Sequence, residues 1–308
     1  MVDVRTRRPA PVGGGAPPAA MRRRGPLTPL FFLIPYLLLF GMFVAVPAVY
    51  GLYISLHEWD YLLPGKPFVG LDNYAALFDP ASPVHDNFWT SMKATGIFTV
   101  GSVPPLVVLP LGVAIILNRR FPGRTFFRAV FFLPFVLGVA VISVMWRILL
   151  DPNLGFVNHL FGLDIPWTTD LPWAWVSLIG ITVWWTLGFN AVIYLAGLQD
   201  IPRELYDAAS VDGAGAWHRF VHVTLPGLRP VAVFVTTTTI LASANMFGQA
   251  LLVTQGAPGV ETRTAIMYIA QEGLVDYRMG SAAAMSYVLT FILIVVSVIN
   301  FRIFRSRS

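Results

Sequence analysis

The sequence predicts an all-α membrane protein that crosses the bilayer six times. Hydrophobic residues make up 56% of the 308-residue chain and charged residues only 12%, a balance that would leave a soluble domain with an apolar surface. Six apolar segments are each long enough to cross the hydrocarbon core, which takes a helix of about 20 residues. They lie at 29–56, 94–117, 126–149, 173–196, 230–253 and 281–301.

Residues 1–27 precede the first span and are rich in Arg, Pro, Gly and Ala, without apolar periodicity. This composition is typical of a disordered tail, because it offers too little apolar surface to offset the entropy lost on folding. We therefore expect a disordered cytoplasmic tail at 1–27 and a membrane domain at 28–308. Prolines inside the spans, such as Pro104, Pro110 and Pro134, are tolerated in membranes and predict kinks.

The Lys and Arg residues gather in alternate connections between the spans. Of the 21 in the chain, six lie in the tail, four in the loop 118–128, three in the loop 197–230 and three at the C-terminal end. The positive-inside rule therefore places both termini and the 197–230 loop in the cytoplasm. Because these charges flank the spans, the net charge of +5 indicates contact with a lipid bilayer and not with nucleic acid.

The 197–230 loop is long and polar, and it separates the fourth span from the fifth. Its first half is predicted to be a short helix, which Pro202 begins and Gly213 ends. A second short helix follows, with Trp217 on its apolar face, and the stretch Thr224-Leu225-Pro226-Gly227 ends it. The sequence thus predicts a helix, a glycine turn and a helix, an arrangement suited to meeting a partner.

This loop resembles the EAA loop of ABC importer permeases. The family pattern is Glu-Ala-Ala, a glycine after three further residues and, past nine more, Ile-x-Leu-Pro. Here Asp207-Ala208-Ala209, Gly213 and Val223-Thr224-Leu225-Pro226 stand at that spacing, with Asp for Glu and Val for Ile. The resemblance implies a coupling helix that sits in a cleft of a separate ATPase subunit. The residues to which it assigns this coupling are Glu204, Asp207, Ala208, Ala209, Asp212, Gly213, Ala214, Leu225 and Pro226.

Three outer segments are similar to the maltose-permease-like, MalF-type branch of the carbohydrate-uptake permeases. They read FVGLDNYAALF at 68–78, MWRILLDPNLGFVN at 145–158 and TQGAPGVETRTAIMYIAQEGLVDYRMGSAAAMS at 254–286. With the EAA-like loop, the resemblance covers nearly everything from residue 30 onward. It implies the type I ABC importer permease fold, in the cytoplasmic membrane of a bacterium.

The resemblance also implies the partners. They are a second, MalG-like permease, two MalK-like ATPase subunits, and an extracytoplasmic sugar-binding protein that delivers the substrate. The chain has no G-x-x-x-x-G-K-[ST] phosphate loop, so Mg-ATP is expected on the ATPase subunits and no cofactor on this chain. No metal site is expected either, because the chain lacks cysteine and no third ligand matches the spacing of His218 and His222.

Polar side chains inside the spans are candidate linings of a substrate pathway, because they are costly to bury in lipid. Their amides and hydroxyls suit sugar hydroxyls, and aromatic rings suit a sugar's C–H surface. The candidates are Trp185, Asn190, Tyr194, Thr238, Asn245, Gln249, Ser286 and Thr290. For the run 236–239 we favour a role in holding helices together, which makes Asn245 and Gln249 the better candidates.

The sequence therefore predicts the permease subunit of an ATP-driven importer that moves a sugar into the cytoplasm by alternating access. It does not predict an enzyme, because no carboxylate pair, activated nucleophile or metal cluster lies near a span end. One alternative is an ABC permease for glycerol phosphate or an oligopeptide, although no Lys or Arg lies deep in a span to meet an anion. The other is an ion-coupled carrier, which would need a mid-span Asp or Glu that the sequence lacks.

Overall fold

A computed structural model describes residues 28–305 of the chain. Within them the protein is almost entirely helical, and its only β-type pairings are two isolated bridges. The predicted all-α class is therefore confirmed. The predicted tail at 1–27 lies outside the described residues.

The chain falls into two compact units, residues 1–50 and residues 51–308. The described part of the first unit consists of α1 (Thr28–Phe40), the π-helical turn η1 (Gly41–Ala45) and the first half of α2 (Val46–Ser55). Its side chains from residue 32 to residue 50 are exposed almost throughout, although nearly all are apolar. Such a surface is suited to lipid, where apolar side chains face outward and the backbone is satisfied within the helix.

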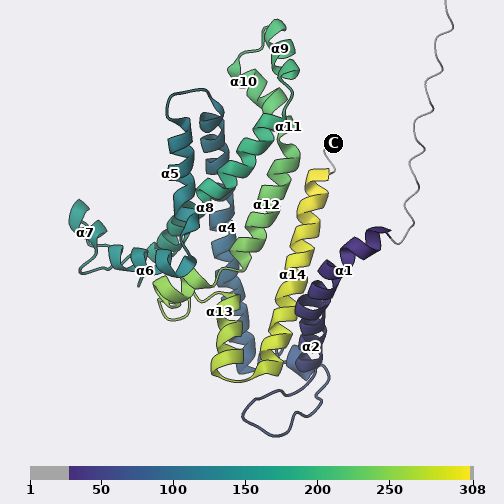
Figure 1. The fold of residues 1–308 in the computed structure, drawn as a ribbon. Helices are drawn as coiled ribbons and strands as arrows, with labels where there is room; N and C mark the ends of the chain where they lie inside the picture. The colour runs from purple at the N-terminus through teal and green to yellow at the C-terminus, as the bar shows by residue number, and fades with distance from the viewer. Residues whose placement is uncertain (1–27, 306–308) are drawn as a thin grey trace, which may run out of the picture. The chain divides into compact units, whose positions relative to one another are not determined.

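Four helices among the described residues are long and apolar enough to cross a bilayer, and two bent pairs bring the number to as many as six. The four are Phe32–Ser55, α4 (Pro83–Asn118), α8 (Trp173–Asp200) and α14 (Met279–Arg305). The bent pairs are α5 (Arg124–Val136) with α6 (Val139–Leu149), and Ala216–Gly227 with α12 (Arg229–Ala244). The predicted count of six holds if each bent pair is one span. In the second unit, α8 packs along α4 and α5, and α12 packs against α4 and α14 (Figure 1).

The third predicted span, 126–149, is not one straight helix. It breaks between α5 and α6, which meet at 94°. Leu137 and Gly138 are extended at the break, three residues after Pro134. Because the helix is interrupted there, the Leu137 carbonyl accepts no hydrogen bond within a helix. The indole Nε1 of Trp185 donates a hydrogen bond to it at 3.0 Å instead.

The fifth predicted span, 230–253, is also interrupted. Helix α12 ends at Ala244, and the chain resumes as the π-helical turn η3 (Ala250–Thr254). In the gap, the hydroxyl of Thr264 donates to the carbonyl of Met246 at 2.7 Å. Gly248 lies so close to Val139 that a Cβ there would come within 2.8 Å of its side chain. The two interrupted spans therefore meet at their breaks.

The second predicted span begins earlier than expected, because α4 starts at Pro83 and not near residue 94. Phe88, near the start of this helix, is fully buried in a cluster with Leu77 and Met285. Helix α4 continues through three internal prolines without an interruption. Pro110 has no N–H for the carbonyl of Leu106, and the side-chain amide of Asn190 supplies the missing donor at 2.9 Å.

Short helices connect these spans. They are α3 (Asp72–Ala75), α7 (Phe156–Phe161), α9 (Arg203–Val211), α10 (Ala216–Arg219), η2 (Phe220–Thr224), α11 (Leu225–Gly227), α13 (Ala265–Ala270) and η4 (Gln271–Val275). Arg263, just before α13, is 7% exposed and donates to the side chains of Asn87 and Ser91 on α4. Its guanidinium lies 4.5 Å from the ring centre of Tyr268, whose pKa burial raises to about 12. This network fastens the last connection to α4.

Candidate functional site

The 197–230 loop has the predicted form of two helices joined at a glycine. Helix α9 closes with both hydrogen bonds of a Schellman motif, from Ala214 N–H to the Ala209 carbonyl at 2.9 Å and from Gly213 N–H to the Ser210 carbonyl at 3.1 Å. Gly213 has φ +75°, a left-handed conformation that glycine adopts without strain. The second helix begins at Ala216 and ends at Gly227, the last residue of the stretch predicted to end it.

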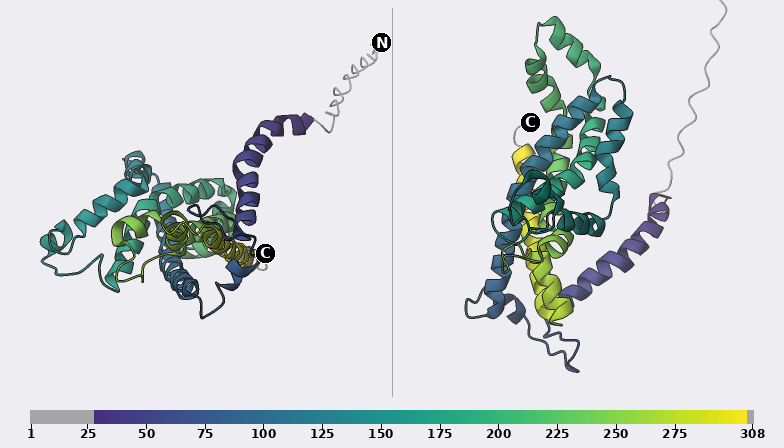
Figure 2. Two further views of the ribbon diagram at one scale, coloured as in Figure 1. Left: turned by 90° about the horizontal axis from the view of Figure 1, so that it is seen from below. Right: turned by 90° about the vertical axis from the view of Figure 1, so that its left-hand side faces the viewer.

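Two side-chain contacts hold α9 against the second helix. The hydroxyls of Tyr206 and Thr224 lie 3.0 Å apart, and Arg219 Nη1 donates to the Ser210 hydroxyl at 3.0 Å. Tyr206 also packs on a buried cluster at the ends of α8 and α12 that includes Leu198. The loop is thus fixed at its base, while α9 and α10 project beyond the ends of α4 and α5 (Figures 1 and 2).

The projecting part of the loop exposes large apolar side chains. Val211 is 89% exposed, Trp217 75% and Leu205 51%. Of the nine residues that the resemblance assigns to coupling, Ala209 and Ala214 are partly buried, and the others are exposed. A Cβ at Gly213 would meet no atom within 4 Å. Exposed apolar side chains that gather in this way are typical of surfaces that meet another protein.

A cavity of about 290 Å³ lies between α4, α5, α8 and the end of α12. It brings together four of the eight predicted pathway residues, which are Trp185, Asn190, Thr238 and Gln249. Its other lining residues are Phe98, Leu106, Phe135, Thr182, Thr186, Phe189, Thr239, Ala242 and Ser243. None of the lining residues is charged. We call this space the central cavity.

The two amides in the central cavity differ in their partners. Asn190 is 5% exposed and donates to the Leu106 carbonyl at 2.9 Å and to the Thr239 hydroxyl at 3.3 Å, so it joins α8 to α4 and α12. Gln249 is 6% exposed, and its side chain makes no hydrogen bond with any described residue. A buried amide without a protein partner is costly unless a ligand or water meets it. Gln249 is therefore the amide of this cavity that is available to a solute.

The other four predicted pathway residues lie outside the lining of the central cavity. Tyr194 is fully buried in the cluster beneath the 197–230 loop. Asn245 is exposed, and its amide donates to the Leu241 carbonyl at 2.7 Å, where α12 ends. Ser286 and Thr290 lie on α14, and each hydroxyl donates to the carbonyl four residues earlier. In this structure all but Tyr194 make hydrogen bonds within their own segment.

Aromatic rings form one wall of the central cavity, and the sequence predicts only Trp185 among them. Phe135 and Phe189 stack with ring centres 4.4 Å apart, and Phe135 lies 6.1 Å from Trp185. Phe189 is next to Asn190 and one turn after Trp185, so the α8 half of the wall could have been found from helical spacing. The α5 half could not, because Phe135 reaches the cavity only through the packing of α5 against α8.

The described residues hold no group of three or more His, Cys, Asp or Glu side chains that could bind a metal ion. His218 and His222 stack with their ring centres 4.0 Å apart on the exposed side of the loop. His222 Nδ1 lies 3.0 Å from the His218 carbonyl, which indicates a hydrogen bond within the helix.

Comparison with known protein families shows to which class of protein this chain belongs. Residues 84–306 match the binding-protein-dependent transport system inner membrane component family. The chain belongs to this family. It is therefore an ABC transporter permease, a transport component of the inner membrane, as its sequence predicts.

Individual relatives agree with this assignment. The permease is 32% identical over 283 residues to the sn-glycerol-3-phosphate transport system permease protein UgpA of Escherichia coli O157:H7, covering 91% of this chain and 94% of that protein. It is 31% identical over 286 residues to the arabinooligosaccharides transport system permease protein AraP of Bacillus subtilis, covering 89% and 88%. In fold it is similar to a bacterial ABC transporter involved in the import of the acidic polysaccharide alginate, with a TM-score of 0.76 at 22% identity over 90% of this chain and 94% of that one.

Proposed function

We propose that the permease moves a neutral carbohydrate into the cytoplasm through the central cavity. The observation that carries this proposal is the lining of the cavity, which combines stacked aromatic rings with uncharged amides and hydroxyls. Aromatic faces cover the C–H surface of a sugar, and amides and hydroxyls replace the hydrogen bonds its hydroxyls make with water. The arabinooligosaccharide permease among the relatives supports a carbohydrate substrate.

An anionic solute is the second candidate, because the relatives also include an sn-glycerol-3-phosphate permease. A phosphate inside a membrane protein calls for Arg or Lys side chains, whose charge-assisted hydrogen bonds offset the loss of water. The central cavity has no such residue in its lining. The uncharged lining therefore favours the neutral carbohydrate.

The 197–230 loop is, in this proposal, the coupling loop that carries the movement of the ATPase subunits to the membrane helices. The Arg residues beside it favour a cytoplasmic position, where ATP is available. Its exposed Leu205, Val211 and Trp217 supply the apolar surface that would enter a cleft of the ATPase. Mg-ATP would bind to two such subunits and not to this chain.

The complete importer would contain a second permease and an extracytoplasmic sugar-binding protein as well. Closure of the ATPase pair would move the coupling loop. Tyr206 and the buried cluster beneath the loop would pass this movement to the ends of α8 and α12. Those helices carry Asn190, Trp185 and Thr238, so the walls of the central cavity would move with them. The result is alternating access, a two-state change biased by nucleotide and by the loaded binding protein.

Growth of a deletion strain tests the substrate class. The strain should lose growth on at least one neutral carbohydrate as sole carbon source and keep its growth on sn-glycerol 3-phosphate. The wild-type chain should restore uptake, and Gln249→Leu should restore membrane levels without restoring uptake. Loss of growth on the anion alone would exclude the neutral-carbohydrate proposal.

A further inference from the structure

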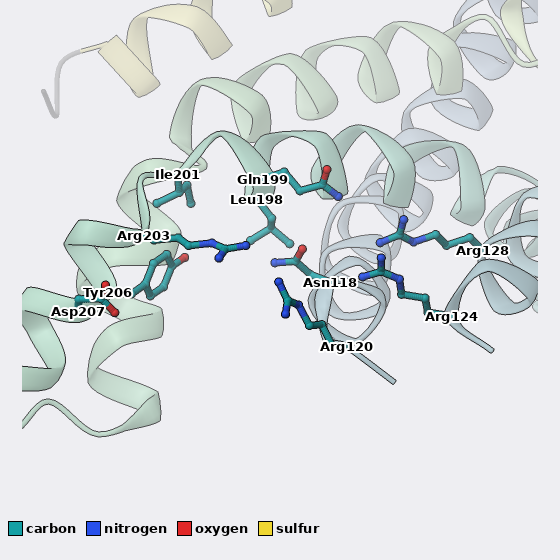
Figure 3. Close-up of a pocket in the computed structure, with 10 residues that line it drawn as sticks. All are labelled: Asn118, Arg120, Arg124, Arg128, Leu198, Gln199, Ile201, Arg203, Tyr206 and Asp207. Carbon is teal, nitrogen blue, oxygen red and sulfur yellow. The ribbon is translucent and has the colours of Figure 1, made fainter. Parts of the chain in front are cut away.

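A second and larger hollow, of about 760 Å³, lies beside the base of the 197–230 loop. We call it the basic pocket. Its lining residues are Asn118, Arg120, Arg124, Arg128, Leu198, Gln199, Ile201, Arg203, Tyr206 and Asp207. They come from the end of α4, the start of α5, the end of α8 and α9. Figure 3 shows Arg120, Arg124 and Arg128 on one side of this space and Arg203 on the other.

The charges of the basic pocket are unbalanced. Four arginines face a single carboxylate, that of Asp207, and none of the four forms an ion pair with a described residue. Arg128 is oriented by a hydrogen bond from Nη2 to the Leu117 carbonyl at 3.0 Å, whereas its buried Nε has no partner. The first turn of α5 carries no acidic residue, so the positive end of that helix adds to the field. Such an excess of positive charge suits the pocket to an anion.

The surroundings of the pocket favour an anion that belongs to a lipid. The pocket lies where α4 ends, α5 begins and α8 ends. The ends of apolar spans are expected at the level of the lipid headgroups. Phe126 is 66% exposed and Phe127 45% exposed on the first turn of α5, and the two rings contact each other. Exposed aromatic rings next to arginines at a span end are suited to acyl chains and headgroups together.

We propose that the basic pocket binds the phosphate of an anionic phospholipid of the cytoplasmic leaflet. The choice of leaflet rests on the orientation proposed above. A phosphodiester between Arg124, Arg128 and Arg203 would join the start of α5 to the start of α9. Because α9 belongs to the 197–230 loop, the bound headgroup would fix the base of the loop to the membrane helices. Lipid composition would thereby influence coupling.

Native mass spectrometry of the full chain with its partner subunits tests this site. The detergent-purified complex is titrated with phosphatidylglycerol and, separately, with phosphatidylcholine. Arg124→Gln with Arg128→Gln should weaken phosphatidylglycerol binding, by about fivefold for each arginine lost. Arg203→Gln, on the opposite wall, should weaken it by about fivefold as well. The control is Arg119→Gln, which removes one positive charge from the 118–128 connection. Arg119 does not line the pocket, so this variant should leave binding unchanged.

Several results would overturn the site. Binding could persist in both pocket variants, or fall equally in Arg119→Gln, which would indicate only a diffuse charge effect. Displacement of phosphatidylglycerol by excess inorganic phosphate would identify a soluble-anion site instead. Binding seen only after removal of the ATPase subunits would mean that carboxylates of the ATPase fill the pocket. Loss of the ATPase from the wild-type complex, with lipid binding as expected, would count against the proposed coupling and leave this site standing.

Discussion

The 197–230 loop, the proposed coupling loop, is held by contacts between residues close in sequence, whereas the central cavity is assembled from distant ones. Tyr206 and Thr224 are 18 positions apart, and the Schellman bonds of α9 span even fewer. Across the cavity, Asn190 contacts Leu106 over 84 positions, and Ser102 contacts Ser243 over 141. The loop can therefore keep its form while its outer surface changes. A change in the cavity wall also changes how the helices pack.

The largest effect should come from the contact between α5 and α8. A Cβ at Gly188 would lie 2.0 Å from the Phe131 carbonyl oxygen and 2.8 Å from the Phe132 Cα, so the two backbones must separate. Gly188→Ala should destabilise the permease by about 1–3 kcal/mol or more and lower its yield in the membrane. Thermal unfolding of the purified complex would measure the loss.

Gly180→Ala is the matched control for Gly188→Ala, because Gly180 is on the same helix and a Cβ there meets nothing within 4 Å. This variant should be as stable as the wild type, or more stable by up to about 1 kcal/mol. Equal unfolding temperatures for the two variants would show that α5 and α8 do not approach each other as described.

Substitutions of the two amides of the central cavity should have different effects, one on stability and the other on transport. Asn190→Leu leaves the buried Leu106 carbonyl without its donor and should cost about 1–3 kcal/mol of stability. Gln249→Leu removes no hydrogen bond to a described residue, so the complex should assemble normally and lose uptake. Unfolding temperature and substrate uptake, measured on both variants, check the pair. Similar losses of assembly in both would mean that Gln249 also holds helices together.

The form of the coupling loop could be predicted because its signals are local. Pro202, Gly213 and the stretch 224–227 each act on the backbone within a few residues, and the structure places a helix start, a turn and a helix end at them. The apolar spans were found for a similar reason, since their length and composition are properties of the segment itself. The family resemblance added the expected role of the loop and not its geometry.

The breaks and the cavity could not be predicted, because they depend on residues far apart in sequence. The bend after Val136 is compensated by the indole of Trp185, and the gap after Ala244 by the hydroxyl of Thr264. Neither partner could be inferred from composition. Asn190 was correctly noted as a polar residue in a span, yet only the structure connects it to the carbonyl freed by Pro110.

A smaller effect is expected where the two helices of the coupling loop meet. Tyr206→Phe removes the hydrogen bond to Thr224 and keeps the ring in its buried cluster, so it should cost about 1 kcal/mol. Assembly should be unchanged, and ATP hydrolysis stimulated by the binding protein should fall modestly. Thr224→Val should have a similar effect, and the double variant should be no worse than either single one. Additive losses would show that the two hydroxyls act separately.

The most direct test of the account is the ATPase activity of complexes that carry Gly213→Val or Asp207→Lys. Both residues are exposed on the coupling loop, and Gly213 has open space around it within the chain. Gly162→Val is the control for backbone strain, because Gly162 ends α7 at φ +62° and also has nothing within 4 Å. It should keep the ATPase bound, and Asp207→Glu should be tolerated.

We predict that Gly213→Val and Asp207→Lys remain in the membrane, lose ATP hydrolysis stimulated by the binding protein, and retain less ATPase on purification than Gly162→Val does. The loss of stimulated ATP hydrolysis in Gly213→Val should be larger than backbone strain can explain, because a left-handed residue costs only on the order of 1 kcal/mol. Wild-type stimulated hydrolysis in both loop variants would contradict the claim that residues 197–230 couple ATP hydrolysis to transport.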